Sequence, residues 1–147
     1  MSCFRKGELN AIRARLRASG LSPSAPRVAI YRWLVAHPVH PTVDVIYKAL
    51  RSRLPTLSRT TVYNVLHAFV EHGLAIALHV EDLEVRYDGN VMPHAHFKCL
   101  RCGRLMDLGM LPTCLGEMVN LPEMCAVRSA ALTFSGFCSQ CVEVNGK

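Results

Sequence analysis

The sequence lacks several features that would place it in other classes of protein. None of its apolar runs is long enough to span a bilayer, so we expect no membrane partner. The first residues, MSCFRKGELNAIRARLRAS, are charged throughout and lack the apolar stretch of a signal peptide. Internal repeats and low-complexity segments are also missing. Because 50% of the residues are hydrophobic, the chain is expected to form a folded core. The lack of a signal peptide makes a cytoplasmic location the default expectation.

Acidic residues are scarce in the first half of the chain. Residues 1–72 hold eleven Lys and Arg against three Asp and Glu, a net charge of +8. Residues 73–147 hold six against eight, a net charge of −2. A basic half joined to a mildly acidic one favours a polyanion partner such as nucleic acid. A solvated basic surface without a partner would give the same charge.

Four helices are predicted in the basic half, from apolar residues at helical spacing. They cover residues 7–19, a segment that begins at Pro26 and ends before HPVHP, a segment that follows Thr42, and a segment between Ser58 and Gly73. Thr42 and Ser58 are suited to N-caps, and Gly73 to a helix stop. The second helix is expected to bury Val28, Tyr31, Leu34 and Val35.

The fourth of these helices has one apolar and one polar face. The apolar face is formed by Val62, Val65, Leu66, Phe69 and Val70. Several side chains outside it can donate to phosphates or read base edges, although an ordinary solvated face would look similar. The candidate DNA-binding residues are Arg59, Thr60, Thr61, Tyr63, Asn64 and His67. Two apolar runs around EDLE then predict a hairpin, so residues 1–88 have the order of a winged helix-turn-helix domain.

Residues 94–147 differ in character from the rest, and the Gly, Asn and Pro of segment 89–93 predict a hinge before them. They contain six of the seven cysteines. HAHFKC, RLMDL and VRSAALTFSGF are predicted strands, and PTCLGEMVNL a short helix. The fold class is therefore α+β, with a small C-terminal α/β domain.

Two C-x-x-C pairs predict a structural zinc site in this second domain. Cys99 with Cys102 and Cys138 with Cys141 can supply four thiolates to one tetrahedral ion. Unrelated buried thiols and a redox disulfide pair remain alternatives. The other late cysteines, Cys114 and Cys125, are expected to be small buried residues, and Cys3 lies near the start of the chain.

The histidines of HAHFKC favour a second site. Side chains alternate between the faces of a strand, so His94 and His96 share a face while Cys99 has the opposite parity. One ion cannot easily take both histidines and Cys99. Thiolates suit zinc, whereas imidazole with carboxylate suits iron or manganese.

The chain resembles the ferric uptake regulator family over nearly its full length. The motifs that carry the resemblance are HPTVDVIYKAL (40–50), SRTTVYNVLHAFVEHGLA (58–75), RYDG (86–89), HAHFKCLRCGRLMDL (94–108) and GFCSQC (136–141). The resemblance implies a homodimeric, metal-activated transcription repressor and not an enzyme, with an α/β dimerisation domain and AT-rich palindromic DNA as partner. It places the regulatory ligands for Fe(II) or Mn(II) on His40, Asp88, His94, His96 and Asp107.

At two positions the residue type resembles that of the peroxide-responsive repressors of that family. These residues are Asp107 and Asn64. In that subgroup bound Fe(II) reacts with hydrogen peroxide and oxidises ligand histidines, whose positions match His40 and His94. An iron, zinc or manganese uptake regulator is the alternative within the family. A metal-dependent hydrolase is an alternative outside the family, but it does not explain the basic helical half together with a polar-faced helix. A zinc-stapled protein adaptor is another alternative, and it predicts no salt-dependent affinity for DNA.

Overall fold

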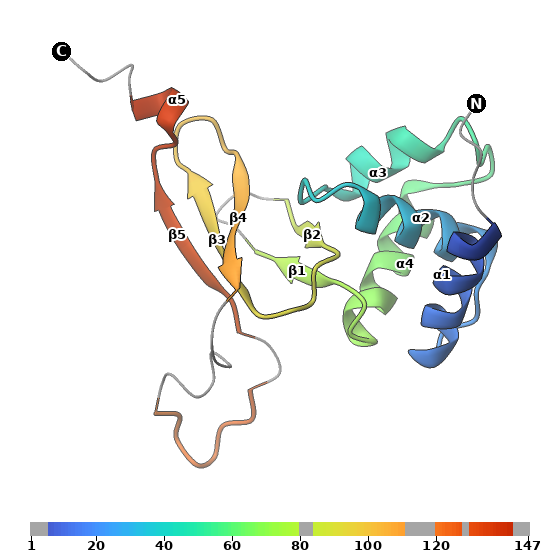
Figure 1. Ribbon diagram of the computed structural model, residues 1–147, viewed down its shortest axis with the longest axis horizontal. Helices are drawn as coiled ribbons and strands as arrows, with labels where there is room; N and C mark the ends of the chain where they lie inside the picture. Colours follow the sequence, from blue (N-terminus) through green and yellow to red (C-terminus); the bar gives the residue numbers. More distant parts are fainter. Residues whose placement is uncertain (1–5, 80–83, 111–119, 128–129, 143–147) are drawn as a thin grey trace. The chain divides into compact units, whose positions relative to one another are not determined.

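The computed structural model describes residues 6–79, 84–110, 120–127 and 130–142 (Figure 1). The chain forms two compact units, Met1–Val91 and Met92–Lys147, so the division lies inside segment 89–93. The first unit is mainly helical and the second contains a small sheet, which confirms the α+β fold class. Within the described residues, no helix combines the length and apolar character that crossing a bilayer requires.

The first unit contains the four helices and the hairpin that the sequence predicts. Its elements are α1 (Lys6–Ala18), α2 (Ala25–Ala36), α3 (Val43–Leu50), α4 (Arg59–Glu71), β1 (Ile76–Leu78) and β2 (Arg86–Asp88). The two strands pair antiparallel, with Ala77 opposite Tyr87. The predicted caps are confirmed, because the Thr42 hydroxyl accepts the Val45 N–H and the Ser58 hydroxyl accepts the Thr61 N–H. Gly73 ends α4 with a φ of +67°, a conformation that glycine adopts without strain.

A single apolar core joins these helices. Phe69 is completely buried in it and meets Tyr31 edge to face, with the ring centroids 5.6 Å apart. The other large side chains with less than 2% exposure include Leu16, Ile30, Ile46, Leu66 and Leu74. Burying each such side chain stabilises a fold by about 1.5–3 kcal/mol, so this unit has a core of its own.

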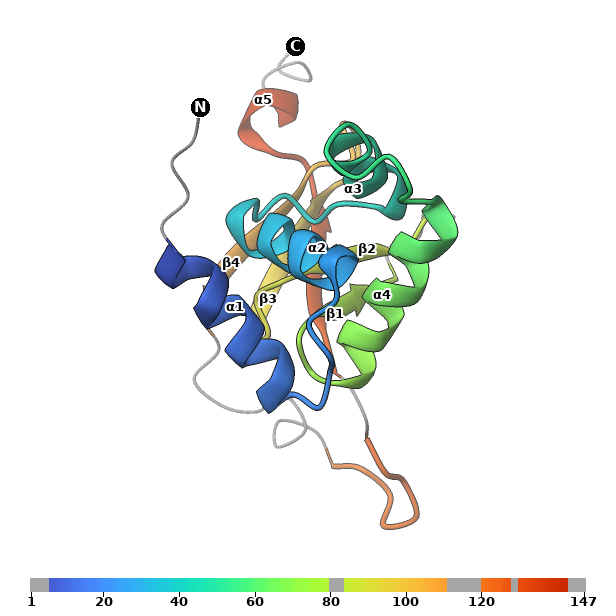
Figure 2. The same cartoon turned by 90° about the vertical axis from the view of Figure 1, so that its right-hand side faces the viewer.

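The predicted buried face of α2 is partly wrong. Val35 is 47% exposed, whereas Ile30 is completely buried. The helix lies between neighbours and contacts α1, α3 and α4 (Figure 2). A helix with neighbours on several sides buries a wider arc than the single stripe that its spacing predicts.

The second unit is built on a three-stranded sheet with the order β4–β3–β5. The strands are β3 (His94–Cys99), β4 (Leu105–Met110) and β5 (Leu132–Gly136), and α5 (Ser139–Val142) follows. The central strand runs antiparallel to β4 and parallel to β5. All three strands were predicted, but α5 was not. Most of the predicted helix PTCLGEMVNL lies outside the described residues.

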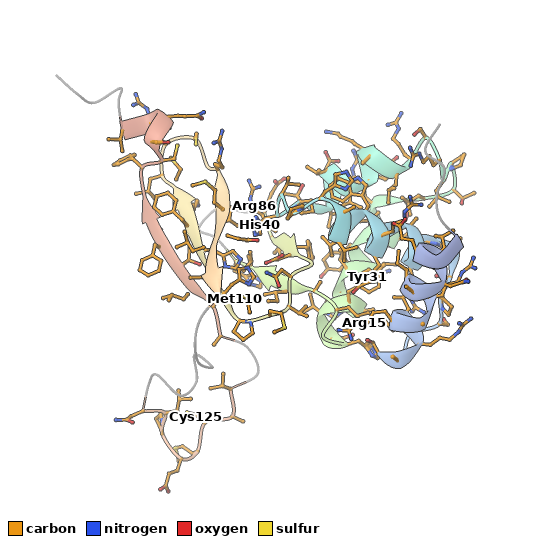
Figure 3. The ribbon with its side chains drawn as sticks, in the orientation of Figure 1. Arg15, Tyr31, His40, Arg86, Met110 and Cys125 are labelled. Carbon is orange, nitrogen blue, oxygen red and sulfur yellow. The ribbon has the colours of Figure 1, made fainter. Side chains whose placement is uncertain are left out.

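The expectation for Cys125 is wrong, because its side chain is exposed. It lies on the segment that joins β4 to β5, below the sheet in Figure 3. The described residues of this segment, 120–127, are all exposed, so they provide no core that would bury Cys125. Cys3 and Cys114 lie outside the described residues.

Candidate metal centres and nucleic-acid interface

Four cysteines converge at one end of the sheet of the second unit. Cys99 ends β3 and Cys102 follows in the turn. Cys138 is the residue before α5, and Cys141 lies within α5. The four sulfur atoms all lie within 4.8 Å of one another. The Sγ atoms of Cys102 and Cys138 are 3.8 Å apart. Sulfur atoms bound to one tetrahedral zinc ion at about 2.3 Å would lie roughly 3.8 Å apart.

Local backbone structure holds the two cysteine turns in place. The first turn closes with a 2.9 Å hydrogen bond from the Gly103 N–H to the Cys99 carbonyl, and Gly103 has a φ of +68°. Arg101 donates to the Cys141 carbonyl at 3.2 Å, which ties the first turn to α5. The pairs therefore meet through ordinary hydrogen bonds and not through a disulfide, since the described cysteines are all free thiols.

The pKa values of two of these thiols are shifted in opposite directions. The backbone N–H groups of Cys102 and Cys138 donate to the Cys99 sulfur and lower its pKa to about 5. The neighbouring Cys138 side chain and burial raise the pKa of Cys141 to about 12. Four thiolates this close repel one another, and a divalent ion would remove that repulsion. The cluster therefore suits structural zinc.

The context of Cys138 and Cys141 also bears on the redox alternative. They lie between the end of β5 and the end of α5, which is the strand-to-helix context of a redox pair. The presence of Cys99 and Cys102 at the same point distinguishes this cluster from such a pair, because a dithiol needs only two sulfurs. The convergence of all four favours zinc.

Two histidines and an aspartate meet on the sheet of the same unit. The rings of His94 and His96 lie on the same side of β3, with centroids 4.4 Å apart. Asp107 lies opposite His96 on β4, and the pairing register shifts between His94 and His96. The Asp107 Oδ1 atom is 3.4 Å from the His94 Nε2 and 3.6 Å from the His96 Nε2. These atoms are close to the spacing of ligands on one ion, roughly 3.0–3.5 Å for bonds of about 2.1 Å.

The His94 ring shows which of its nitrogens is suited to bind a metal. Its Nδ1 lies 2.7 Å from the Met92 carbonyl oxygen, and a carbonyl can only accept. The Nδ1 atom therefore carries the proton, and the Nε2 of the neutral ring presents a lone pair. That lone pair lies near the carboxylate of Asp107, another acceptor. A cation or a proton between them would make the contact favourable, so the site fits Fe(II) or Mn(II).

A second histidine–carboxylate pair lies in the first unit. His40 and Asp88 are both buried, and the His40 Nε2 is 3.7 Å from an Asp88 oxygen. Strand β2 holds the loop that carries His40, because the Tyr87 N–H donates to the Pro41 carbonyl at 2.9 Å. Arg86 also donates to the His40 carbonyl, and the two residues are labelled in Figure 3.

The backbone of His40 is in an uncommon conformation. Its φ is +47°, the left-handed region that non-glycine residues rarely occupy. A conformation of this kind costs roughly 1–3 kcal/mol and is found most often at ligand and switch sites. The strain therefore fits a residue whose position serves binding and not folding alone.

The candidate DNA-binding residues lie at the start and along the outer face of α4. Arg59, Thr60, Tyr63, Asn64 and His67 are exposed. Thr61 differs from them, because its hydroxyl lies 2.8 Å from that of Ser58 and its N–H is held by the same cap. It therefore belongs to the helix start, and the remaining five form the accessible set.

Sequence reasoning missed the residues that surround Arg59. Asp44 accepts from the Arg59 Nε at 2.8 Å, and the Arg59 Cζ lies 4.5 Å from the centre of the Tyr47 ring. Lys48 also contacts Asp44, at 2.6 Å. An Asp and a Lys four residues apart on a predicted helix signal only their own ion pair. The contact of Asp44 with Arg59 depends instead on the packing of α3 against α4.

Comparison with known proteins finds a matching family and several similar proteins. Residues 18–111 match the ferric uptake regulator family. The peroxide-responsive repressor PerR of Staphylococcus epidermidis is 33% identical over 139 residues, which cover 92% of this chain and 91% of that protein. PerR of Staphylococcus aureus is 38% identical over 100 residues, 68% of each chain. The structure of the Helicobacter pylori ferric uptake regulator Fur has a similar fold, with a TM-score of 0.68, 19% identity and coverage of 96% of this chain and 95% of that one.

Proposed function

Because the chain belongs to the ferric uptake regulator family, we propose that it is a metal-dependent, DNA-binding transcriptional repressor that senses peroxide. The family consists of metal-responsive transcription regulators, and the proposal assigns the chain no catalytic turnover. We place it in the cytoplasm, where its DNA partner is accessible.

The regulatory site is proposed to consist of His40, Asp88, His94, His96 and Asp107, all bound to one Fe(II) or Mn(II) ion. The donor set supports this, since imidazole and carboxylate ligands suit these metals. The first two residues belong to the first unit and the other three to the second. A shared ion would favour the one arrangement of the units in which all five ligands are engaged.

The structural zinc site is proposed to be Cys99, Cys102, Cys138 and Cys141. With four thiolates it has no open position, so it would hold the fold and take no part in sensing. The separation of ligand types is the observation that carries the whole proposal. Four thiolates converge at one point, and His94 and His96 converge with Asp107 at another.

DNA binding is proposed to use α4 as the recognition helix. The residues proposed to contact DNA are Arg59, Thr60, Tyr63, Asn64 and His67, with Thr61 at the helix start. A homodimer would present two such helices to the half-sites of an AT-rich palindrome. Exposed apolar side chains on the second unit support self-association, because an isolated sheet face would keep them in water. They are Leu108, Met110, Phe134 and Phe137.

Peroxide sensing is proposed to act through His40 and His94. Fe(II), when bound, supplies the electron that turns hydrogen peroxide into a strong oxidant beside the ligand rings. An oxidised imidazole is a poorer ligand, so the ion would be held less tightly and the DNA-binding arrangement would lose its advantage. The relatives named peroxide-responsive repressors support this assignment, as does aspartate at position 107.

One titration tests this function. Zinc-loaded protein is supplied with Fe(II) or Mn(II), and its binding to AT-rich palindromic DNA is followed by fluorescence anisotropy before and after hydrogen peroxide. We expect metal-dependent binding with either ion and loss after peroxide with Fe(II) only. Peptide mass spectrometry should then find one added oxygen atom at His40 or His94.

The matched control is the His37→Ala variant. His37 lies in the same HPVHP segment as His40 but is exposed and bonds the Trp33 carbonyl. It should leave both metal activation and peroxide loss unchanged. If the Fe(II) form keeps its DNA after peroxide, the protein is instead an uptake regulator of the same family. If the affinity for DNA is the same with and without Fe(II) or Mn(II), the repressor mechanism proposed here is wrong.

A further inference from the structure

Arg59, the first residue of the proposed recognition helix, is held by two residues of α3. Its Nε donates to the Oδ1 of Asp44 at 2.8 Å, and its guanidinium lies over the ring of Tyr47. The other carboxylate oxygen of Asp44 contacts the Lys48 ammonium at 2.6 Å. Hydrogen bonds from Lys48 and Arg59 lower the pKa of Asp44, so it is fully ionised at neutral pH.

This arrangement uses only one side of the arginine fork. The ion pair is made through Nε, and no residue in the described part of the chain accepts a hydrogen bond from either Nη atom. The side chain is still 60% exposed. Two parallel N–H donors are therefore available to a ligand, on a side chain whose position is already fixed.

A fixed arginine fork matches the major-groove edge of guanine. The O6 and N7 atoms of guanine accept two parallel hydrogen bonds, and arginine is the side chain that most often makes them. A side chain that is ordered before binding loses less conformational entropy when it binds. The first residues of a recognition helix are also those that reach base edges.

The carboxylate distinguishes this role from a simple phosphate contact. A negative charge 2.8 Å from the arginine weakens its attraction to the phosphate backbone. A phosphate contact needs charge alone and would gain nothing from Asp44. Base recognition needs orientation, which the Asp44 bond and the Tyr47 ring supply.

We propose that Arg59 reads one guanine in each operator half-site and that Asp44 is its positioning residue. The inference rests on the proposed DNA-binding function and adds a base preference to it. The operator is then AT-rich but carries a G·C pair at one fixed position in each half.

Operator selection followed by single-substitution binding tests this inference. The metal-loaded, full-length protein first selects its operator from a random duplex library. Its affinity is then measured for every single base-pair change in the half-site. The variants are Arg59→Lys, Asp44→Ala and the control Glu8→Ala. The control also removes an exposed acid from an ion pair, that between Glu8 and Arg32.

The wild type should prefer G·C at one position by about 5- to 150-fold, the ratio that 1–3 kcal/mol gives. Arg59→Lys should remove most of this preference, because lysine cannot form the fork. Asp44→Ala should reduce it several-fold while affinity for non-operator DNA stays equal or rises. Glu8→Ala should change neither quantity. A purely structural role for Asp44 would lower the melting temperature and weaken binding to all sequences equally.

Three results would overturn the inference. The first is equal weakening on every sequence in Arg59→Lys or Asp44→Ala. The second is a wild-type base preference that neither variant changes. The third is failure of the metal-loaded protein to bind any DNA specifically, which would also remove the proposed function. The first two results contradict the inference but leave the proposed function intact. Failure of the inference can therefore be distinguished from failure of the proposed function.

Discussion

Removal of zinc is expected to unfold the second unit and leave the first one folded. The buried apolar cluster of the second unit consists of Cys99, Cys138 and Cys141, with Phe97 and Met106 packed against them. These cysteines are the same residues that would bind the ion. Without it, the described part of this unit keeps few other buried apolar side chains, such as Ala95 and Leu105.

The expected effect is large because of the size of the zinc contribution. Structural zinc binding contributes apparent free energies of about 10–16 kcal/mol, whereas a whole domain is stable by only about 5–15 kcal/mol. The free energy lost with the ion therefore exceeds the stability that the small core could supply. The first unit has its own core around Phe69 and should not respond.

Hydrogen exchange with a zinc indicator would test this expectation. Cys138→Ser should release zinc and remove the protection of β3, β4 and β5, with α1–α4 still protected. Cys125→Ser is the matched control, since Cys125 is exposed and lies outside the cluster. Continued protection of the sheet after zinc loss would refute the reasoning. Equal zinc release by the Cys125→Ser variant would do the same.

Other predictions concern the first unit. Ser58→Ala removes the cap of α4 and should cost about 1 kcal/mol in urea unfolding, whereas Ser58→Asn should cost much less. Phe69→Ala should cost about 3–5 kcal/mol by the same assay, and Phe69→Leu clearly less. Asp44 has a pKa below its usual 3.8 in the folded state, so its contribution is complete above that pH and is lost as the pH falls through the folded value. In the Asp44→Asn variant, the free energy of unfolding should therefore depend less on pH in that acid range. Its pH dependence near neutrality should be unchanged.

Much of the fold could be predicted because its local signals agree with its packing. The Ser58 cap, the apolar stripe of α4 and Gly73 all mark the same helix, and the structure has it at Arg59–Glu71. The face of α2 was not predictable in the same way. Its burial depends on three neighbouring helices, which periodicity within one segment does not reveal.

The candidate sites show the same limit. Strand parity correctly indicated that His94 and His96 lie on one side of β3, and two C-x-x-C pairs indicated the sulfur cluster. The left-handed backbone of His40 and the hold of Asp44 on Arg59 were not visible in the sequence. Both depend on which segments meet in space. Cys125 lies among residues 120–127, all of which are exposed, and composition does not indicate this exposure.

The central claim is that one ion is bound by residues of both units, and a Mn(II) titration of the zinc-loaded protein tests it most directly. The wild type and the His37→Ala control should each bind one regulatory ion per chain. The His94→Ala, His40→Ala and Asp88→Asn variants should each lose that same ion, with the fold checked by circular dichroism. If His40→Ala and Asp88→Asn bind Mn(II) as tightly as the wild type while His94→Ala does not, the ion belongs to the second unit alone and the proposed switch is wrong.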